Sequence, residues 1–290
     1  MTQLAKKKVK IALAQISPRL GDIDYNLRLH IDYIERAIKD KADIIMFPEL
    51  SLTGYSLKDS VYDTALTFSD KFLDPLYQAS KDIAIGFGMV ELSNLFEAKN
   101  SILFLEDGKC IARHRKVYLP TYGVFEEKRY FTPGNRFHAF ESRFGRLGIL
   151  ICEDVWHPTS TMVLARDGAL AIFVGSAALL RGVKDSEKPD IIKSWEGINR
   201  TSALLFTSYL IFCNRVGVED GLSFWGGSEI IDPNGDVVLK APYFKEALLF
   251  GEIDWLKIKH ARIHTTLVSD ERLDIVMEEL KRIDKIAKEY

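Results

Sequence analysis

Cysteine is scarce in this chain of 290 residues, and none of the three copies belongs to a Cys-x-x-Cys pair. Cys110, Cys152 and Cys213 therefore indicate neither a disulfide framework nor a zinc ribbon. An odd number of widely spaced cysteines fits a reducing compartment, so we expect a cytoplasmic protein. Because free cysteine is among the most buried residue types, each of the three is first expected to be a small core side chain.

An excess of charge of either sign is also missing. Thirty-nine Lys and Arg residues and 41 Asp and Glu residues give a formal net charge of -2. This balance provides neither the basic footprint of a nucleic-acid-binding domain nor a polybasic segment for a membrane surface. The apolar run near the N-terminus is interrupted by Gln15 and Pro18, is too short to span a bilayer, and lacks the cleavage site of a signal peptide. We therefore expect no nucleic-acid partner and no membrane partner.

The composition that remains is that of an ordinary globular chain, with 47% hydrophobic and 28% charged residues. Apolar segments over 9–16 and 43–47 predict strands, and a helical stripe between them runs to about Lys39. A second helical stretch ends near Ser80. Pro48 ends the second strand because proline cannot donate a hydrogen bond to a β ladder.

Strand patterns dominate further along the chain, with helices at 159–166, around Trp195 and near the C-terminus. Asp107-Gly108 predicts a tight hairpin turn. Strands interleaved with helices on this scale predict a layered α/β fold in which helices cover the sheets. The further predicted strands are 83–90, 101–106, 109–115, 137–142, 145–151, 170–174, 210–214, 228–231, 237–239 and 247–253.

Three ionisable residues stand at the ends of predicted strands. Glu49 follows the segment IIMF, Lys116 follows CIARHR, and Cys152 ends RLGILI. Functional groups in open α/β sheets gather just beyond the carboxyl ends of strands. Each residue taken alone has an ordinary role as a solvated or core side chain, but together they predict a pocket that holds a carboxylate, an ammonium group and a thiol.

The chemistry of these three groups is complementary. A thiol with a pKa of about 8.5 needs a base or a positive field to become nucleophilic at neutral pH. Glu49 is expected to accept the thiol proton and later to give it to the departing nitrogen. Lys116 and the backbone N–H groups of 153–155 are expected to stabilise an oxyanion, with Trp156 excluding water.

The sequence around these residues resembles that of the nitrilase, or carbon–nitrogen hydrolase, superfamily, and the resemblance extends over nearly the whole chain. Its blocks occur in order as MFPELSLTGY, RHRKVYLPTYGVFEEKRYFTPG and GRLGILICEDVWHP. The resemblance implies a catalytic triad of Glu49, Lys116 and Cys152, and it places at Glu127 a second glutamate that positions lysine and substrate. It also implies an αββα sandwich of two mixed sheets covered by helices, which we expect as a single domain over 1–290 with a helical tail from about 268.

Within the superfamily, YGVFEEKRYFTPG is most similar to the glutaminase domain of NAD synthetases and to related stand-alone amidases. Tyr122 matches a position that lines the substrate pocket there, and we expect Glu153, Trp156 and Ser176 to line the same pocket. Ser176 stands in FVGSAALLRG, which departs from the usual Asn-x-Ser-Pro pattern and leaves the choice of amide open. The loop over 176–189 is expected to help select the substrate. The chain contains no SGGxDS-like pyrophosphatase loop, so we do not expect it to adenylate a substrate.

The implied reaction is hydrolysis of a small linear amide or carbamoyl compound through a thioester on the cysteine, without a metal or an organic cofactor. A nitrile substrate is an open alternative because the same triad serves it. A glutaminase-like subunit that supplies ammonia to a partner synthetase is another alternative, and a catalytically silent interaction module is a third. The resemblance also implies a homodimer or a higher homo-oligomer. His260 and His264 have the spacing of a zinc pair but lack the accompanying HExxH glutamate, so we expect no metal site.

Overall fold

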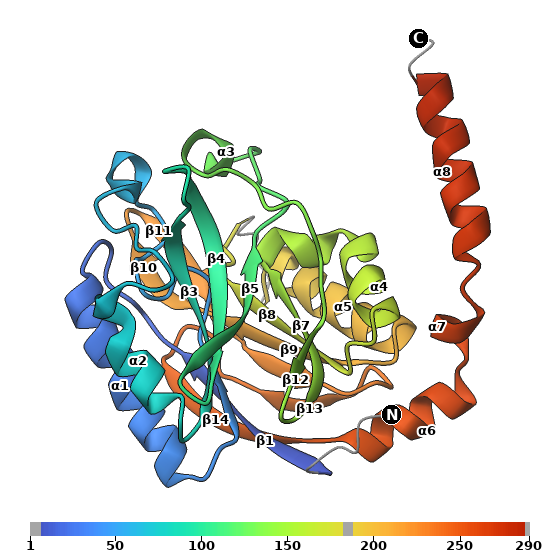
Figure 1. The fold of residues 1–290 in the computed structure, drawn as a ribbon, viewed down its shortest axis with the longest axis horizontal. Helices are drawn as coiled ribbons and strands as arrows, with labels where there is room; N and C mark the ends of the chain where they lie inside the picture. Colours follow the sequence, from blue (N-terminus) through green and yellow to red (C-terminus); the bar gives the residue numbers. More distant parts are fainter. Residues whose placement is uncertain (1–6, 182–187, 288–290) are drawn as a thin grey trace.

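The computed structural model describes residues 7–181 and 188–287. Two six-stranded sheets lie face to face, and helices cover their outer surfaces (Figure 1). The predicted αββα sandwich is therefore confirmed. Residues 182–187, which form part of the predicted substrate-selecting loop 176–189, lie outside the described residues. The same holds for 1–6 and 288–290 of the predicted 1–290 domain.

The first sheet contains most of the N-terminal half of the chain. Alternation along its strands decides which layer each side chain joins: Ile44 and Met46 face the other sheet, whereas Ile45 and Phe47 pack beneath helices. Its strand order is β14 (Ala247–Asp254), β1 (Lys8–Gln15), β2 (Ile44–Met46), β3 (Ala84–Leu92), β4 (Ala98–Glu106) and β5 (Lys109–Arg115), covered by α1 (Ile23–Lys39) and α2 (Asp74–Ala79).

The second sheet is built from the later strands and lies beneath α4 (Pro158–Arg166) and α5 (Asp190–Leu205). Aromatic side chains such as Phe104 and Phe173 meet across the space between the sheets, with ring centroids 6.0 Å apart. The strand order is β13 (Val237–Lys240), β12 (Glu229–Ile231), β9 (Tyr209–Asn214), β8 (Ala171–Ser176), β7 (Gly145–Ile151) and β6 (Phe140–Ser142).

Strand direction places several loop segments at corresponding ends of the two sheets. β1, β2 and β3 are parallel, and β5 shares their direction because two antiparallel steps separate it from β3. β7, β8 and β9 are parallel to one another in the second sheet. The segments that follow β2 and β5 therefore leave one edge of the first sheet, and those that follow β7 and β8 leave one edge of the second.

Shorter elements complete the fold. The hairpin of β10 (Val216–Glu219) and β11 (Leu222–Trp225) and the short helix α3 (Glu127–Tyr130) were not predicted from the sequence. Within the described residues, 3-10 helices occur at Lys58–Val61, Lys71–Leu73 and Cys152–Trp156. After β14 the chain forms α6 (Trp255–His264), α7 (Leu267–Asp270) and α8 (Leu273–Ala287), and α8 extends away from the sandwich in Figure 1.

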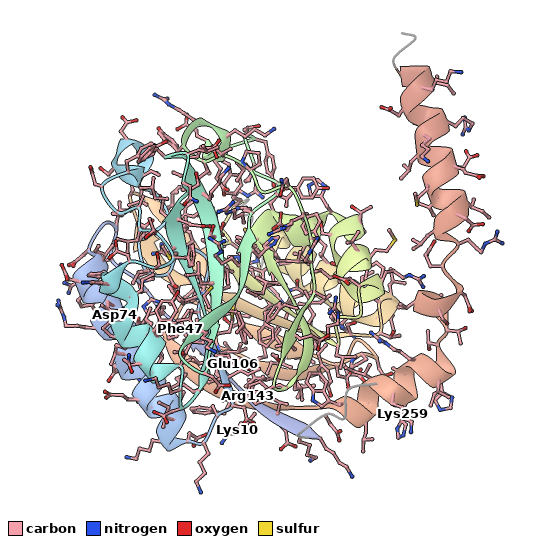
Figure 2. The ribbon with its side chains drawn as sticks, viewed as in Figure 1. Lys10, Phe47, Asp74, Glu106, Arg143 and Lys259 are labelled. Carbon is pink, nitrogen blue, oxygen red and sulfur yellow. The ribbon has the colours of Figure 1, made fainter. Side chains whose placement is uncertain are left out.

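Side chains fill the space between the layers (Figure 2). Phe47 lies inside the body, whereas Asp74 and Lys259 lie at its periphery. Glu106 and Arg143 lie side by side, where the carboxylate of Glu106 accepts the backbone N–H of Arg143 at 3.0 Å. None of the helices within the described ranges combines the length and the apolar character needed to cross a membrane.

Candidate active site

Three buried side chains stand just beyond strands β2, β5 and β7. Glu49, Lys116 and Cys152 have exposed fractions of 0%, 1% and 6%. Lys116 Nζ lies 2.7 Å from Glu49 Oε1, and the charges of both groups act on the Cys152 thiol. The chain thus has a carboxylate, an ammonium group and a thiol together at the corresponding ends of its two sheets.

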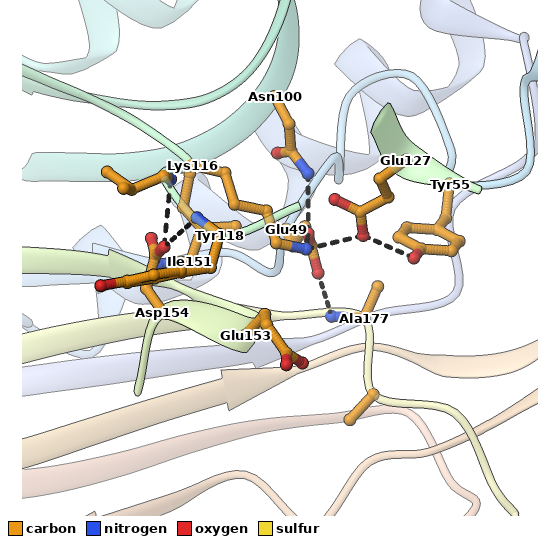
Figure 3. A network of polar contacts seen from close by, with 12 residues as sticks. Glu49, Tyr55, Asn100, Lys116, Tyr118, Glu127, Ile151, Glu153, Asp154 and Ala177 are labelled. Atoms are coloured by element: carbon orange, nitrogen blue, oxygen red, sulfur yellow. Dashed lines mark hydrogen bonds and ion pairs between the residues drawn. The ribbon is translucent and has the colours of Figure 1, made fainter. Parts of the chain in front are cut away.

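Glu49 is held at both carboxylate oxygens (Figure 3). Oε1 accepts hydrogen bonds from Asn100 Nδ2 and Lys116 Nζ, each at 2.7 Å, and Oε2 accepts the backbone N–H of Ala177 at 2.8 Å. These donors come from β4, from the end of β5 and from the end of β8. Because the donors belong to different strands, packing of both sheets fixes the orientation of the carboxylate.

Lys116 lies between two carboxylates. Its Nζ donates to Glu127 Oε1 at 2.7 Å as well as to Glu49, and Tyr55 Oη donates to the same Glu127 oxygen at 2.7 Å (Figure 3). Burial opposes the charged form of Lys116, but Glu127 and Glu49 outweigh it and raise the lysine pKa well above its usual value. The two carboxylates therefore favour the charged form of the buried lysine.

Cys152 sits in a strained and protected position directly after β7. Its φ of 46° lies in the left-handed region that side chains other than glycine rarely adopt, at a cost of about 1–3 kcal/mol. Burial and the Glu49 carboxylate raise the pKa of the Cys152 thiol well above its usual value, against the effects of the Lys116 charge and the Ser176 hydroxyl. The resting thiol is therefore protonated, and a base must take its proton before the sulfur can attack.

Asp154 links the segment that bears the cysteine to the segment that bears the lysine. Its Oδ1 accepts the backbone N–H groups of Val117 and Tyr118, both at 3.0 Å, and its Oδ2 accepts that of Ile151 at 3.1 Å. His114 Nε2 lies 2.7 Å from the same Oδ2. Because Val117 follows Lys116 and Ile151 precedes Cys152, this one carboxylate fixes the two segments relative to each other.

The residues predicted to contact substrate lie around this cluster. Tyr122 is 45% exposed, and its hydroxyl donates to Glu153 Oε2 at 2.8 Å. Ser176 ends β8, and its buried hydroxyl acts on the Cys152 thiol. Trp156 packs edge-on against Trp195 of α5, with ring centroids 5.3 Å apart, which joins it to the helix layer. Their contact with substrate stays a prediction.

Several residues of the site were not identified from the sequence. Asn100 and Tyr55 contact the two glutamates directly, and Asp154 stands two positions after Cys152 in the same motif. A polar Asn100 within the strand segment AKNSILFLE was a signal, because buried strand positions rarely hold an amide without a partner. No group of three or more potential metal-ligating side chains occurs within 7–181 and 188–287.

Glu127 gives the site an expected pH dependence. Burial raises its pKa from 4.5 to about 7, against the opposing charge of Lys116. As the pH falls through 7, Glu127 becomes neutral and Lys116 pairs with Glu49 alone, so we expect kcat/KM to decrease. The unfolded chain binds fewer protons at this residue between pH 4.5 and 7, so Glu127 lowers the free energy of unfolding as the pH rises through that range.

The pH profile of kcat/KM for the wild type and for Glu127→Gln checks this assignment. The wild type should lose activity with an apparent pKa near 7, and the variant should be less active but should lack that step. An unchanged acid limb in Glu127→Gln would assign the step to another group.

The chain is similar to a family model and to known proteins over most of its length. The sequence model of the carbon–nitrogen hydrolase family matches residues 10–263. Over 257 residues the chain is 34% identical to the glutamine-dependent NAD(+) synthetase of Acinetobacter baylyi, covering 89% of this chain and 46% of that protein. It is 30% identical to an (R)-stereoselective amidase of Pseudomonas sp., covering 95% of this chain and 96% of the amidase. The chain thus spans less than half of the synthetase and nearly all of the amidase.

A solved structure supports the same relationship. The crystal structure of a carbon–nitrogen hydrolase from Helicobacter pylori G27 superposes with a TM-score of 0.86 at 27% identity. The superposition covers 95% of this chain and 99% of the other. The two chains therefore share the whole sandwich and not one sheet alone.

Proposed function

The chain belongs to the carbon–nitrogen hydrolase family, and from this premise we propose that it hydrolyses a small linear amide or carbamoyl compound through a thioester on Cys152. The observation that carries the proposal is the buried cluster in which Lys116 bonds Glu49 and Glu127 beside the thiol. Burying a cation with two carboxylates is costly, and such arrangements concentrate at functional sites. Similarity to an amidase over nearly the full length of both chains supports an amide substrate.

The first half of the proposed reaction forms the thioester. Glu49 takes the proton of the Cys152 thiol as the sulfur attacks the carbonyl carbon, which gives a tetrahedral adduct. The Lys116 ammonium and backbone N–H groups at the start of the Cys152–Trp156 turn stabilise the negative oxygen. As the carbon–nitrogen bond breaks, Glu49 gives its proton to the leaving nitrogen, and ammonia or an amine departs.

The second half regenerates the enzyme. Glu49 takes a proton from a water molecule, whose oxygen attacks the thioester carbon. The second tetrahedral adduct collapses, the carbon–sulfur bond breaks, and the proton held by Glu49 returns to the sulfur of Cys152. The products are a carboxylic acid and the resting thiol, so the net consumption is one water per amide.

Ammonia release from a panel of substrates tests the proposed class. Linear amides should be hydrolysed to ammonia and a carboxylic acid, and carbamoyl amines to ammonia, carbon dioxide and the amine, with rates that depend on Cys152. Both amide and nitrile hydrolysis use the same three residues, so only the substrate preference separates them. A nitrile that is consumed faster than every amide would favour the nitrilase alternative. Absence of turnover on all three classes would overturn the proposed function.

Two oppositely charged side chains, Glu153 and Arg181, lie at Tyr122. They favour a second candidate function, a glutaminase-type activity that supplies ammonia to a synthetase. Glu153 accepts the Tyr122 hydroxyl, and the Arg181 guanidinium lies 5.3 Å from the Tyr122 ring centroid and 5.0 Å from that of Phe125. A carboxylate and a guanidinium on one aromatic side chain match the ammonium and carboxylate groups of an amino acid such as glutamine. Similarity to a glutamine-dependent synthetase supports this candidate.

Substitution of Arg181 distinguishes the two candidates. If the pair recognises an amino acid, Arg181→Gln should raise the KM for glutamine about tenfold or more, the loss expected for one charged contact. The KM for butyramide, which lacks both charged groups, should stay unchanged. Equal effects on both substrates would assign Arg181 a structural role and remove the support for glutamine.

We also propose that the protein forms a homodimer or a higher homo-oligomer. The apolar side chains of α8, including Leu280 and Ile283, are exposed in the single chain, with exposed fractions of 58% and 51%. Exposed apolar stripes of this kind mark interaction surfaces. Sedimentation equilibrium should give a multiple of the 33.0 kDa chain mass, and a mass of one chain would contradict the proposal.

A further inference from the structure

A cavity of about 260 Å³ lies outside the cluster of Glu49, Lys116 and Cys152. It is bounded by β5, the outermost strand of the first sheet, and by the segment that returns along β5 between α3 and β6 (Figure 1). Two contacts hold this segment against β5: Gly134 donates its N–H to the Lys116 carbonyl at 2.7 Å, and Phe137 stacks on His114. The polar residues that line the cavity are Arg113, His114, Arg115, Asn135, Arg136 and His138.

The charge of this cavity is positive. None of its lining residues is acidic. Arg113 and Arg115 share one carboxylate, that of Glu91, at 2.7 and 2.8 Å, so one of their two positive charges is left over. Arg136 is exposed and forms no ion pair with any residue of the described ranges.

The acidic groups that approach the histidines are already engaged. Asp154, which bonds His114, also accepts three backbone N–H groups. Asp167 acts on His138 through its charge but pairs with Arg146 at 2.6 Å. The cavity therefore combines an uncommitted guanidinium with two imidazoles, and the carboxylates near these imidazoles lie outside its lining and have other partners.

We propose that this cavity binds a small multivalent oxyanion, either a phosphate monoester or a polycarboxylate. Guanidinium groups bind both by paired, charge-assisted hydrogen bonds, and Arg136 supplies such a group. The volume lies just below the usual range of ligand pockets, which limits the occupant to a small molecule. The binding itself is independent of the proposed function.

Two contacts connect the cavity to the proposed active site. His114 lines the cavity and bonds Asp154, the carboxylate that fixes the segments bearing Cys152 and Lys116. Gly134 also lines it and donates to the backbone of Lys116. An anion that orders His114 and Gly134 changes the free energy of placing Lys116 and Cys152 in their catalytic positions. The bound anion then changes the affinity for the amide, and the bound amide changes the affinity for the anion by the same factor.

Calorimetric titration of the full chain with inorganic pyrophosphate and, separately, with citrate tests the site. Saturable binding at one site is expected, stronger for pyrophosphate if the natural ligand is a phosphate and stronger for citrate if it is a polycarboxylate. Arg136→Ala should weaken binding about tenfold or more, the loss expected for one charge-assisted contact. Arg28→Ala on α1, also an exposed arginine, should leave it unchanged.

Two results would overturn the anion site: absence of saturable binding to both probes, or equal weakening in the Arg136 and Arg28 variants. Unchanged far-UV circular dichroism and Tm in both variants exclude misfolding as the cause of a loss. The coupling, which rests on the proposed function, is measured with Cys152→Ala so that the amide stays intact. The Kd for pyrophosphate should differ with and without a saturating amide, and an identical Kd would overturn the coupling while retaining the site.

Discussion

Replacing Cys152 by alanine is expected to lower kcat by roughly 10⁴-fold or more, the scale seen when a nucleophile that acts as part of a triad is removed. No other group supplies the sulfur that forms the proposed thioester. The fold should survive, because alanine keeps the β-carbon and the change removes a single buried atom. Ammonia release and Tm, measured on the same preparation, check both parts of this expectation.

Cys110→Ala is the matched control. Cys110 is a half-buried cysteine of β5, and burial raises its pKa to about 11. This substitution should leave kcat within about twofold, because no step of the proposed reaction involves Cys110. Residual turnover in Cys152→Ala close to that of Cys110→Ala would remove Cys152 from the mechanism.

Replacing Glu49 by glutamine is expected to lower kcat by roughly 10²–10⁴-fold while lowering the pKa of the Cys152 thiol. The first effect follows from loss of the base that takes the thiol proton. The second follows because the Glu49 charge is, after burial, the main influence that raises this pKa, and Lys116 acts in the opposite direction. A thiol that is more ionised in a less active enzyme would show that Glu49 contributes by transferring protons during the reaction and not by ionising the resting thiol.

Ultraviolet absorbance of the thiolate as a function of pH, with Cys152→Ala as the blank, measures the second effect. The titration midpoint of Cys152 should move to lower pH in Glu49→Gln. A midpoint that moves to higher pH would mean that Glu49 promotes ionisation of the resting thiol, which contradicts a Glu49 charge that raises the thiol pKa.

Glu229→Gln provides a closely matched control for this experiment. Like Glu49, Glu229 is buried and bonds an asparagine and a lysine, with distances of 2.9 Å to Asn199 and 2.7 Å to Lys240. It lies on β12, and no Cys152 interaction involves it. The control should share any loss of stability but not the loss of kcat or the shift of the thiol pKa.

The positions of the main site residues were predictable because strand ends are readable from sequence. Glu49 and Cys152 stand at the ends of apolar segments that fold as strands, and Lys116 follows the more polar strand β5. β2 and β5 run in the same direction, so Glu49 and Lys116 lie at the same end of the first sheet. The family resemblance added the sandwich architecture. Neither argument gave the contact partners, since Asn100 reaches Glu49 only once β4 pairs beside β3.

Other features depended on local conformation that the pattern did not specify. The β10–β11 hairpin was missed, although Asp220-Gly221 carries a tight-turn signal and both residues have positive φ, 49° and 77°. The left-handed φ of Cys152 was also unforeseen, because it occurs where β7 passes into a 3-10 helix that the strand pattern does not specify.

Mass spectrometry of the protein quenched during turnover tests the central claim most directly. With the amide that releases ammonia fastest, the mass should increase by that of the acyl group, on the peptide that contains Cys152, and hydroxylamine should remove it. Cys152→Ala should show no increase. An acyl group on another residue, or rapid ammonia release in the Cys152 variant, would contradict the proposed thioester mechanism.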